Sequence, residues 1–310
     1  MISIPISKPS RSGLRLTTIA FPLLLFIALC FLSPSFLSLQ NLRNINGQVA
    51  ALLMVSLGQL VVALIGGIDL SVGAALSLAT TIVASLDPDL AIVVALLAGL
   101  SVGLANGIGV TLIGVHPLIM TIASMTFLQG LALLIQPVPG GSVPGFLAVL
   151  ATSSPAGVPA AFFWCIGGVA ITSFILSKTG FGLGLFAIGA NPGNAARNGI
   201  PVKRYSIACY VICSVAATVA GFFVSARVSS GDASVGAPFA LDSITAIAMG
   251  GVQLAGGMGS VTGVVLGTIT LGLMTNGMNL IGVSPFLRTA ATGMLLLLAI
   301  SMQRRNVIGV

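Results

Sequence analysis

The residues best suited to chemistry in this chain are its few carboxylates, because glutamate is absent and only five aspartates occur. The string GGIDLSVG contains Gly66, Gly67, Asp69, Ser71 and Gly73. Two glycines followed by Asp and Ser are typical of a helix break, where a carboxylate accepts hydrogen bonds from the first free amides of the next helix. At membrane depth the same carboxylate can instead line a polar pathway. Both roles fit Asp69, and they fit Asp232 in a matching string equally well.

Amide side chains within apolar segments form a second group of candidates. They are Gln59, Gln129, Asn106 and Asn276. Interhelical hydrogen bonding explains them as well as pathway lining does. The single histidine and the four cysteines stand apart from the carboxylates, so neither a metal site nor a catalytic cluster is predicted. No GxxxxGK[ST] string occurs, so we expect no enzyme activity and no cofactor, with any ATP hydrolysis in a partner subunit.

The loop at 178–204 contains a short segment with the start and stop signals of a helix. Asn191 can cap the first amides, Pro192 fits the first helical position, and Gly199 suits a left-handed turn after the last. The segment comprises Asn191, Pro192, Gly193, Asn194, Ala195, Ala196, Arg197, Asn198 and Gly199. A short basic helix outside lipid, with small residues for close approach, offers a surface to another subunit. An ordinary well-capped loop is the other interpretation.

The elements that position these residues follow from composition. The chain has 310 residues, of which 56% are hydrophobic and only 5% charged. A soluble globule with so few polar groups would aggregate. In lipid, only helices and closed barrels satisfy the backbone, and the apolar runs here do not alternate as barrel strands do. The sequence therefore predicts an all-α polytopic membrane protein.

A crossing needs about 20 apolar residues, which predicts about ten transmembrane helices. We expect them at 18–39, 48–66, 70–86, 90–113, 117–136, 160–177, 204–226, 238–254, 258–282 and 286–302. The third and the eighth are short. The predicted organisation is a cytoplasmic tail at 1–17, one transmembrane domain at 18–302, and a cytoplasmic tail at 303–310.

Charge predicts the orientation of these helices. With the N-terminus in the cytoplasm, ten crossings leave only Arg43, Arg227 and Arg288 of the twelve cations outside. This distribution agrees with the positive-inside rule and places both termini in the cytoplasm. It also accounts for the formal net charge of +7, so membrane lipid, and no nucleic acid, is the expected environment.

An internal repeat relates the two halves of the chain. DLSVGA at 69–74 recurs as DASVGA at 232–237, and LIGVHP at 112–117 recurs as LIGVSP at 280–285. Spans two to five thus match spans seven to ten. Because an odd number of crossings separates matching points, the halves are expected to be inverted in the membrane. Inverted repeats are typical of transporters with alternating access.

Three strings resemble the permease subunits of bacterial ribose-type sugar ABC importers. They are GGIDLSVG at 66–73, AIGANPGNAARNGIPV at 187–202 and LDSITAIAMGGVQLAGGMGSVTGVVLG at 241–267, where VQL departs from the commoner TSL. The resemblance runs from about residue 36 to residue 302. It implies that 191–199 is a coupling helix that docks into a cleft on an ATPase subunit. It also implies two permease subunits, a two-domain ATPase and a periplasmic solute-binding protein.

The sequence is therefore interpreted as a bacterial inner-membrane permease forming half of the translocation pathway for a small hydrophilic solute, with a monosaccharide favoured. SGDASVG at 230–236 is closer to members that pair with a different permease, so the second subunit is either another copy or a paralogue. The alternative is a stand-alone ion-coupled sugar carrier. The absence of glutamate and of a clear coupling-ion carboxylate at mid-membrane argues against that alternative.

Overall fold

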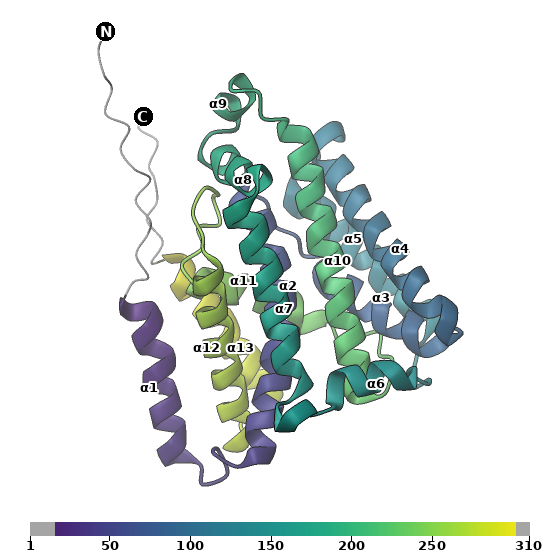
Figure 1. Ribbon diagram of the computed structural model, residues 1–310, viewed down its shortest axis with the longest axis vertical. Coiled ribbons are helices and arrows are strands. Elements are labelled where there is room, and N and C mark those ends of the chain that lie inside the picture. Colours follow the sequence, from purple (N-terminus) through teal and green to yellow (C-terminus); the bar gives the residue numbers. More distant parts are fainter. Residues whose placement is uncertain (1–15, 302–310) are drawn as a thin grey trace.

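The computed structural model describes residues 16–301, which form a bundle of α-helices (Figure 1). The helices are α1 (Leu16–Leu32), α2 (Leu39–Leu64), α3 (Val72–Ser85), α4 (Pro88–Ile108), α5 (Pro117–Ile135), α6 (Gly145–Thr152), α7 (Ala160–Lys178), α8 (Gly180–Ala190), α9 (Pro192–Arg197), α10 (Val202–Val228), α11 (Ala237–Met249), α12 (Val261–Leu280) and α13 (Pro285–Ser301). A π-helical turn, η1 (Gly109–Ile113), extends α4, and a 3-10 turn, η2 (Pro155–Gly157), follows α6.

Local sequence explains where several helices begin. Asp87 and His116 each precede a proline, and their side chains accept hydrogen bonds from the amides two residues on. The proline then occupies the first helical position, where its missing N–H is not needed. Ser38 and Ser260 cap α2 and α12 in the same way, through the amides three residues on.

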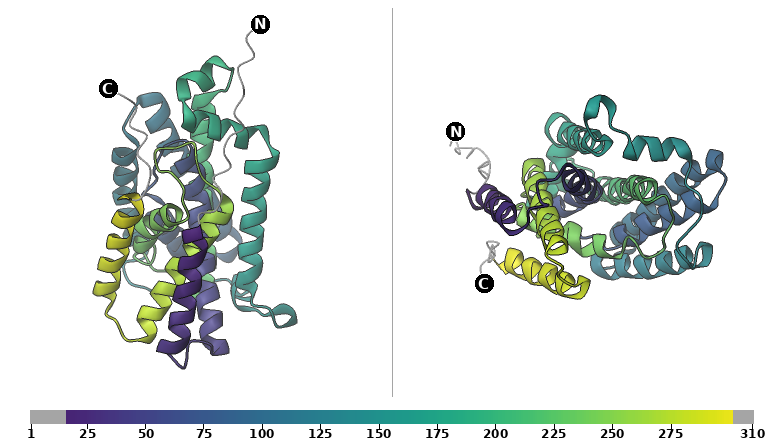
Figure 2. Two further views of the ribbon diagram at one scale, coloured as in Figure 1. Left: turned by 90° about the vertical axis from the view of Figure 1, so that its left-hand side faces the viewer. Right: turned by 90° about the horizontal axis from the view of Figure 1, so that it is seen from below.

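The centre of the bundle consists of α2 and α10, which lie side by side with the other helices around them (Figure 2). Helix α10 also packs against α3 and α4. Gly103 and Gly107 on α4 face it, and a Cβ there would lie only 2.5 and 2.8 Å from the Cα atoms of Val211 and Ile207. Such close backbone approach through small residues is the usual way helices pack without a hydrophobic driving force.

The outer helices expose large apolar side chains. Phe31 on α1 and Phe286 on α13 are each 87% exposed, and Phe127 on α5 is 70% exposed. An apolar outer surface of this kind fits lipid. Within the described residues, 16–301, six helices are long and apolar enough to cross a membrane, namely α2, α4 with η1, α5, α7, α10 and α12. The chain is thus a multi-pass membrane protein.

Each of the ten predicted spans contains one helix, but four of these helices have fewer than 18 residues. They are α1, α3, α11 and α13. The number of crossings therefore stays a prediction. Helices α3 and α11, with 14 and 13 residues, rise only about 20 Å against a hydrocarbon core of about 30 Å. Most of their residues are buried in protein, where interrupted helices are tolerated.

The boundaries of the first two predicted spans were wrong. The helix predicted at 18–39 ends at Leu32, and α2 begins at Leu39 rather than at 48. The stretch after Leu39 is polar, so hydropathy excluded it, yet Asn41 within it is buried and hydrogen-bonded across the bundle. Helices α6 and α8 were not predicted. The tails at 1–17 and 303–310 fall almost entirely outside the described residues.

The two ends of the bundle differ in the elements they carry. Helices α8 and α9 lie at one end and α6 at the other, with α7 running between them (Figure 1). The loops that follow α2 and α11 reach the α8 end, where Gly257 lies against Gly189 and Ala190, and Gly66 lies against Ala255 and Gly256. The segment at 191–199 and the loop around Ser154 therefore lie at opposite ends of the molecule.

Candidate functional site

The predicted helix in the 178–204 loop is present as α9. The side chain of Asn191 accepts a hydrogen bond from the amide of Asn194 (2.9 Å), and Pro192 is the first helical residue. Gly199 has φ +82°, the left-handed conformation that glycine adopts without strain. The sequence thus correctly predicted where this helix starts and how it stops.

Most of the 191–199 segment is exposed, including Ala196 and Arg197. Ala195 is the exception, because it is only 4% exposed and packs within this chain. Of the two small residues, therefore, only Ala196 presents a surface to another subunit.

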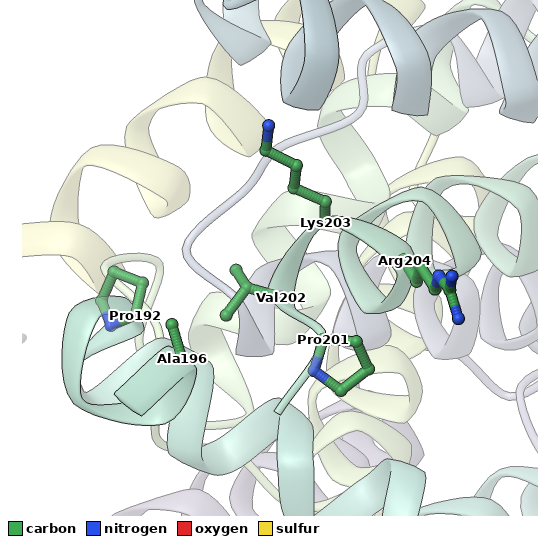
Figure 3. A pocket seen from close by; sticks show the side chains of 6 residues that line it. All are labelled: Pro192, Ala196, Pro201, Val202, Lys203 and Arg204. Carbon is green, nitrogen blue, oxygen red and sulfur yellow. The ribbon is translucent and has the colours of Figure 1, made fainter. Parts of the chain in front are cut away.

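A cavity of about 460 Å³ lies between α9 and the start of α10. It is lined by Pro192, Ala196, Pro201, Val202, Lys203 and Arg204 (Figure 3). The side chains of Lys203 and Arg204 extend in different directions in Figure 3. The α9 end thus offers a mainly apolar hollow whose lining includes the two cationic residues Lys203 and Arg204.

The Asp69 loop, residues 65–71, is the turn between α2 and α3, and its residues Gly67, Asp69 and Ser71 are buried. The carboxylate oxygen Oδ1 of Asp69 accepts hydrogen bonds from the N–H of Ser71 (2.9 Å) and from its hydroxyl (2.6 Å). Ser71 is the residue that precedes α3, and its own side chain caps no amide of that helix. The carboxylate therefore fixes the turn before α3, whereas we expected it to accept from the first amides of the helix itself.

Asn106 extends this hydrogen-bonded group into α4 and α5. Its amide nitrogen donates to the hydroxyl of Ser71 (2.8 Å), and its oxygen accepts from the hydroxyl of Ser124. Asp69, Ser71 and Asn106 are all 0% exposed. The structure thus brings three of the predicted residues into one chain of hydrogen bonds.

Gln59 on α2 holds the backbone of the same loop. With its amide oriented to satisfy both atoms, it donates to the carbonyl of Asp69 (3.1 Å) and accepts from the Asp69 N–H (3.2 Å). Because Gln59 is 0% exposed, these contacts pair backbone groups that would otherwise be buried without partners.

Two buried polar atoms near this loop have no hydrogen-bond partner among the described residues. They are the second carboxylate oxygen of Asp69 (Oδ2) and the hydroxyl of Tyr210 on α10. A Cβ on Gly67 would lie 2.8 Å from that hydroxyl, so only glycine fits there beside Tyr210. The Asp69 loop is therefore tightly packed but incompletely hydrogen-bonded.

The Asp232 loop, residues 229–236, has the same local turn before α11. The N–H and the hydroxyl of Ser234 both donate to Asp232 Oδ1, each at 2.7 Å. The hydroxyl of Thr80 on α3 donates to the Asp232 carbonyl (3.0 Å) and accepts from its N–H (3.2 Å). Here, however, Asp232 is half-buried and Ser234 exposed.

The two loops meet where α3 and α11 begin. A Cβ on Gly73 would lie 2.5 Å from the carbonyl oxygen of Gly236, and a Cβ on Gly236 would overlap the carbonyl of Gly73. The N–H of Gly236 also donates to the hydroxyl of Ser77 on α3 (2.9 Å). Both glycines are therefore required by backbone contact between matching positions of the two strings.

Comparison with known proteins decides the class. A family described as branched-chain amino acid transport system / permease component matches residues 41–300. The ribose import permease of Bacillus subtilis is 34% identical over 292 residues, covering 91% of this chain and 90% of the relative. The ribose import permease of Escherichia coli K12 is 32% identical over 295 residues, covering 92% of each chain.

The chain belongs to this permease family. The L-arabinose transport system permease of Escherichia coli K12 is a further relative, 33% identical over 296 residues, covering 90% of this chain and 87% of the relative. No solved structure gives a significant match. The resemblance to ribose-type permeases is thereby confirmed. The protein is the membrane component of an ABC importer, in which a separate subunit hydrolyses ATP, and the stand-alone carrier is not supported.

Asn276, the remaining residue that the sequence predicted for the pathway, lies apart from the Asp69 group. It forms a reciprocal amide pair with Asn41, with N–O distances of 2.8 and 3.1 Å. Both side chains are buried, so the pair joins α12 to the start of α2. Within residues 16–301 no hydrogen bond connects this pair to Asn106.

Several residues of these groups escaped the sequence analysis, namely Asn41 at the polar start of α2 and three residues within apolar helices. Tyr210, Ser124 and Thr80 each lie in an apolar helix, where single polar residues commonly bond to their own helix. The available signal was weak in each case. Tyr210 is one of only two tyrosines in the chain, and a phenol inside an apolar span needs a partner.

Proposed function

We propose that this permease forms half of an ATP-driven translocation pathway for a monosaccharide. The observation that carries the proposal is its identity of 34% and 32% with two ribose import permeases over nine-tenths of both chains. The L-arabinose permease among its relatives supports a sugar of similar size. The description of the family, which names branched-chain amino acids, provides the competing substrate class.

Substrate class is tested with the permease co-expressed with its ATPase and solute-binding subunits and reconstituted in liposomes. Uptake of radiolabelled ribose, arabinose and leucine is measured with and without ATP. We expect ATP-dependent accumulation of a sugar and none of leucine. Accumulation of leucine alone, or uptake without ATP, would contradict the proposal.

The segment at 191–199 is the proposed contact with the ATPase subunit. Its support is structural: α9 is short, capped at Asn191, exposed at Ala196 and Arg197, and bordered by a mainly apolar hollow. We further propose a periplasmic solute-binding protein as a partner, and a second permease subunit that is a copy of this chain or a paralogue. Together with the ATPase subunit, these two partners complete the importer.

The candidate pathway residues remain those of the two loops, the Asp69 group with Asn106 and the Asp232 group, together with Asn276. We also propose that the two halves form an inverted repeat, which would place the two loops at equivalent depths from opposite membrane faces. Helices α2 to α5 match α10 to α13 in order, and each set has a short second helix, of 14 residues in α3 and 13 in α11. Interrupted helices at a repeat interface are the usual place for transport sites.

We propose ten crossings in a bacterial inner membrane, with both termini and α9 in the cytoplasm. The charge distribution supports this orientation. In a cysteine-free background, a single Cys at Ser154 should react with an impermeant thiol reagent in intact spheroplasts, and one at Asn194 only after permeabilisation. Labelling of both positions from outside would contradict the topology.

A further inference from the structure

Three segments that are far apart in the sequence come into contact near the end of α8, through the backbone atoms of glycine residues. They are the start of the Asp69 loop at Gly66, the last residues of α8 at Gly189, and the turn at 253–257 that joins α11 to α12. The N–H of Gly257 donates to the carbonyl of Leu64 (2.9 Å), which ties the turn to α2. We call this contact, formed by Gly66, Gly189, Gly256 and Gly257, the glycine junction.

The glycine junction has no room for a side chain at Gly189 or Gly256, and a Cβ at Gly66 or Gly257 would be tightly packed. A Cβ on Gly189 would overlap the carbonyl of Leu64 and the N–H of Gly257. A Cβ on Gly256 would lie 2.9 Å from the Gly66 nitrogen and 3.1 Å from the Gly189 Cα. Since backbone meets backbone here, no rotamer change can absorb a small displacement, and closely packed contacts of this kind transmit it.

The junction also has a notable place in the chain. Gly189 is three residues before Pro192, so it is directly continuous with α9. Gly66 begins the loop that carries Asp69, and the 253–257 turn connects two helices of the second half. If α9 moves and displaces the end of α8, the displacement is therefore passed at the glycine junction to Gly66 in the first half of the permease and to the 253–257 turn in the second half.

We propose that the glycine junction relays the movement of α9 to the two halves of the permease, with Gly189 and Gly257 as positioning residues for transport. The inference rests on the proposed function, because it takes α9 as the contact with the ATPase. An added methyl group at the junction separates the segments, so ATP hydrolysis continues while less solute is moved for each ATP consumed.

Two alanine substitutions in the connection between α11 and α12, residues 250–260, provide a matched test. Gly251 and Gly257 both have positive φ, +79° and +77°, so alanine imposes the same backbone strain at each. They differ in their surroundings, because a Cβ at Gly251 meets nothing within 4 Å, whereas one at Gly257 lies 3.0 Å from the Ala190 nitrogen. Gly189→Ala, with the open Gly180→Ala as its control in α8, forms a second and more severe pair.

The experiment measures sugar uptake and ATP hydrolysis in the same proteoliposomes, with the complete transporter reconstituted. We expect Gly257→Ala to lower the ratio of sugar transported to ATP hydrolysed by about tenfold, within the usual range of coupling between two sites. The Gly251→Ala complex should keep the ratio of the unsubstituted complex. Gly189→Ala should lower it further, and Gly180→Ala should leave it unchanged.

Three results would overturn the inference. The first is an unchanged ratio in Gly257→Ala. The second is a parallel loss of uptake and hydrolysis, or of assembly, in Gly257→Ala but not in Gly251→Ala, because the contact would then be purely structural. The third is the absence of uptake by the unsubstituted complex, which contradicts the proposed function itself and is distinguished because it precedes any substitution.

Discussion

The Asp69 and Asp232 loops have the same local sequence and the same turn, but they occupy different surroundings. In each, one carboxylate oxygen accepts from the N–H and the hydroxyl of the serine two residues on. In each, a polar side chain from a neighbouring helix holds the backbone of the aspartate. Yet Asp69 is 0% exposed, whereas Asp232 is half-buried beside the exposed Ser234.

The difference between the two loops shows that the local sequence determines the turn but not its burial. The Asp-x-Ser sequence sets the turn through contacts within three residues. Burial depends on the rest of the fold, which packs α4 and α10 over the first loop and leaves part of the second open. Hydrogen bonds of equal geometry therefore contribute differently to stability, because an unpaired donor in the interior has no water to replace its partner.

The largest expected difference follows from replacing each aspartate with leucine. In Asp69→Leu the N–H and hydroxyl of Ser71 lose their acceptor in the interior, at about 1–3 kcal/mol each. In Asp232→Leu water can reach Ser234, so the loss is about 1 kcal/mol. Thermal unfolding in detergent should show the larger decrease in midpoint for Asp69→Leu. Equal decreases would mean that burial does not distinguish the loops.

A difference of the same order is expected for the side chains that hydrogen-bond to the backbones of Asp69 and Asp232. Gln59→Leu leaves the N–H and carbonyl of Asp69 buried without partners, at about 1–3 kcal/mol each. Thr80→Val removes the corresponding contacts of the half-buried Asp232, with a smaller effect on the unfolding midpoint. Thr81→Val is the matched control, because among the described residues the hydroxyl of Thr81 donates to the carbonyl of Leu78 in its own helix and to no other group. A larger effect for Thr81→Val than for Thr80→Val would contradict this account.

The smallest effects are expected for asparagine, which keeps the oxygen that accepts from the serine. Asp232→Asn should change the free energy of unfolding by less than about 0.5 kcal/mol, as for ordinary surface substitutions. Asp69→Asn should be milder than Asp69→Leu in both stability and sugar uptake. If Asn is as damaging as Leu at Asp69, the charge of the carboxylate, and not its turn, is what the permease requires.

Local signals predicted much of the architecture, and long-range contacts limited the rest. The caps at Asn191 and Gly199 predicted α9, and apolar runs located a helix in each of ten expected spans. Hydropathy failed at the start of α2, where Asn41 is stabilised by Asn276, 235 residues away. The same limit applies to the site. The Asp69 turn is local, but its contacts with Asn106, Gln59 and Tyr210 depend on packing that no short string contains.

The small residues of α9 illustrate the same limit. Ala195 and Ala196 are adjacent and chemically identical, so the sequence assigned both to close approach by a partner. The structure separates them, because Ala195 is buried within the chain and Ala196 is exposed beside the hollow at the start of α10. A test of the partner contact must therefore use Ala196.

The most direct test of the account is Ala196→Arg in the complete transporter, with Ser154→Arg at the opposite end of the bundle as the control. An unpaired charge buried in a subunit contact costs about 3–5 kcal/mol. We measure co-purification of the ATPase subunit and ATP-dependent sugar uptake at equal amounts of inserted permease. Ala196→Arg should lose both together, while Ser154→Arg retains the bound ATPase. Normal uptake by a well-inserted Ala196→Arg permease would contradict the claim that α9 couples this chain to its ATPase.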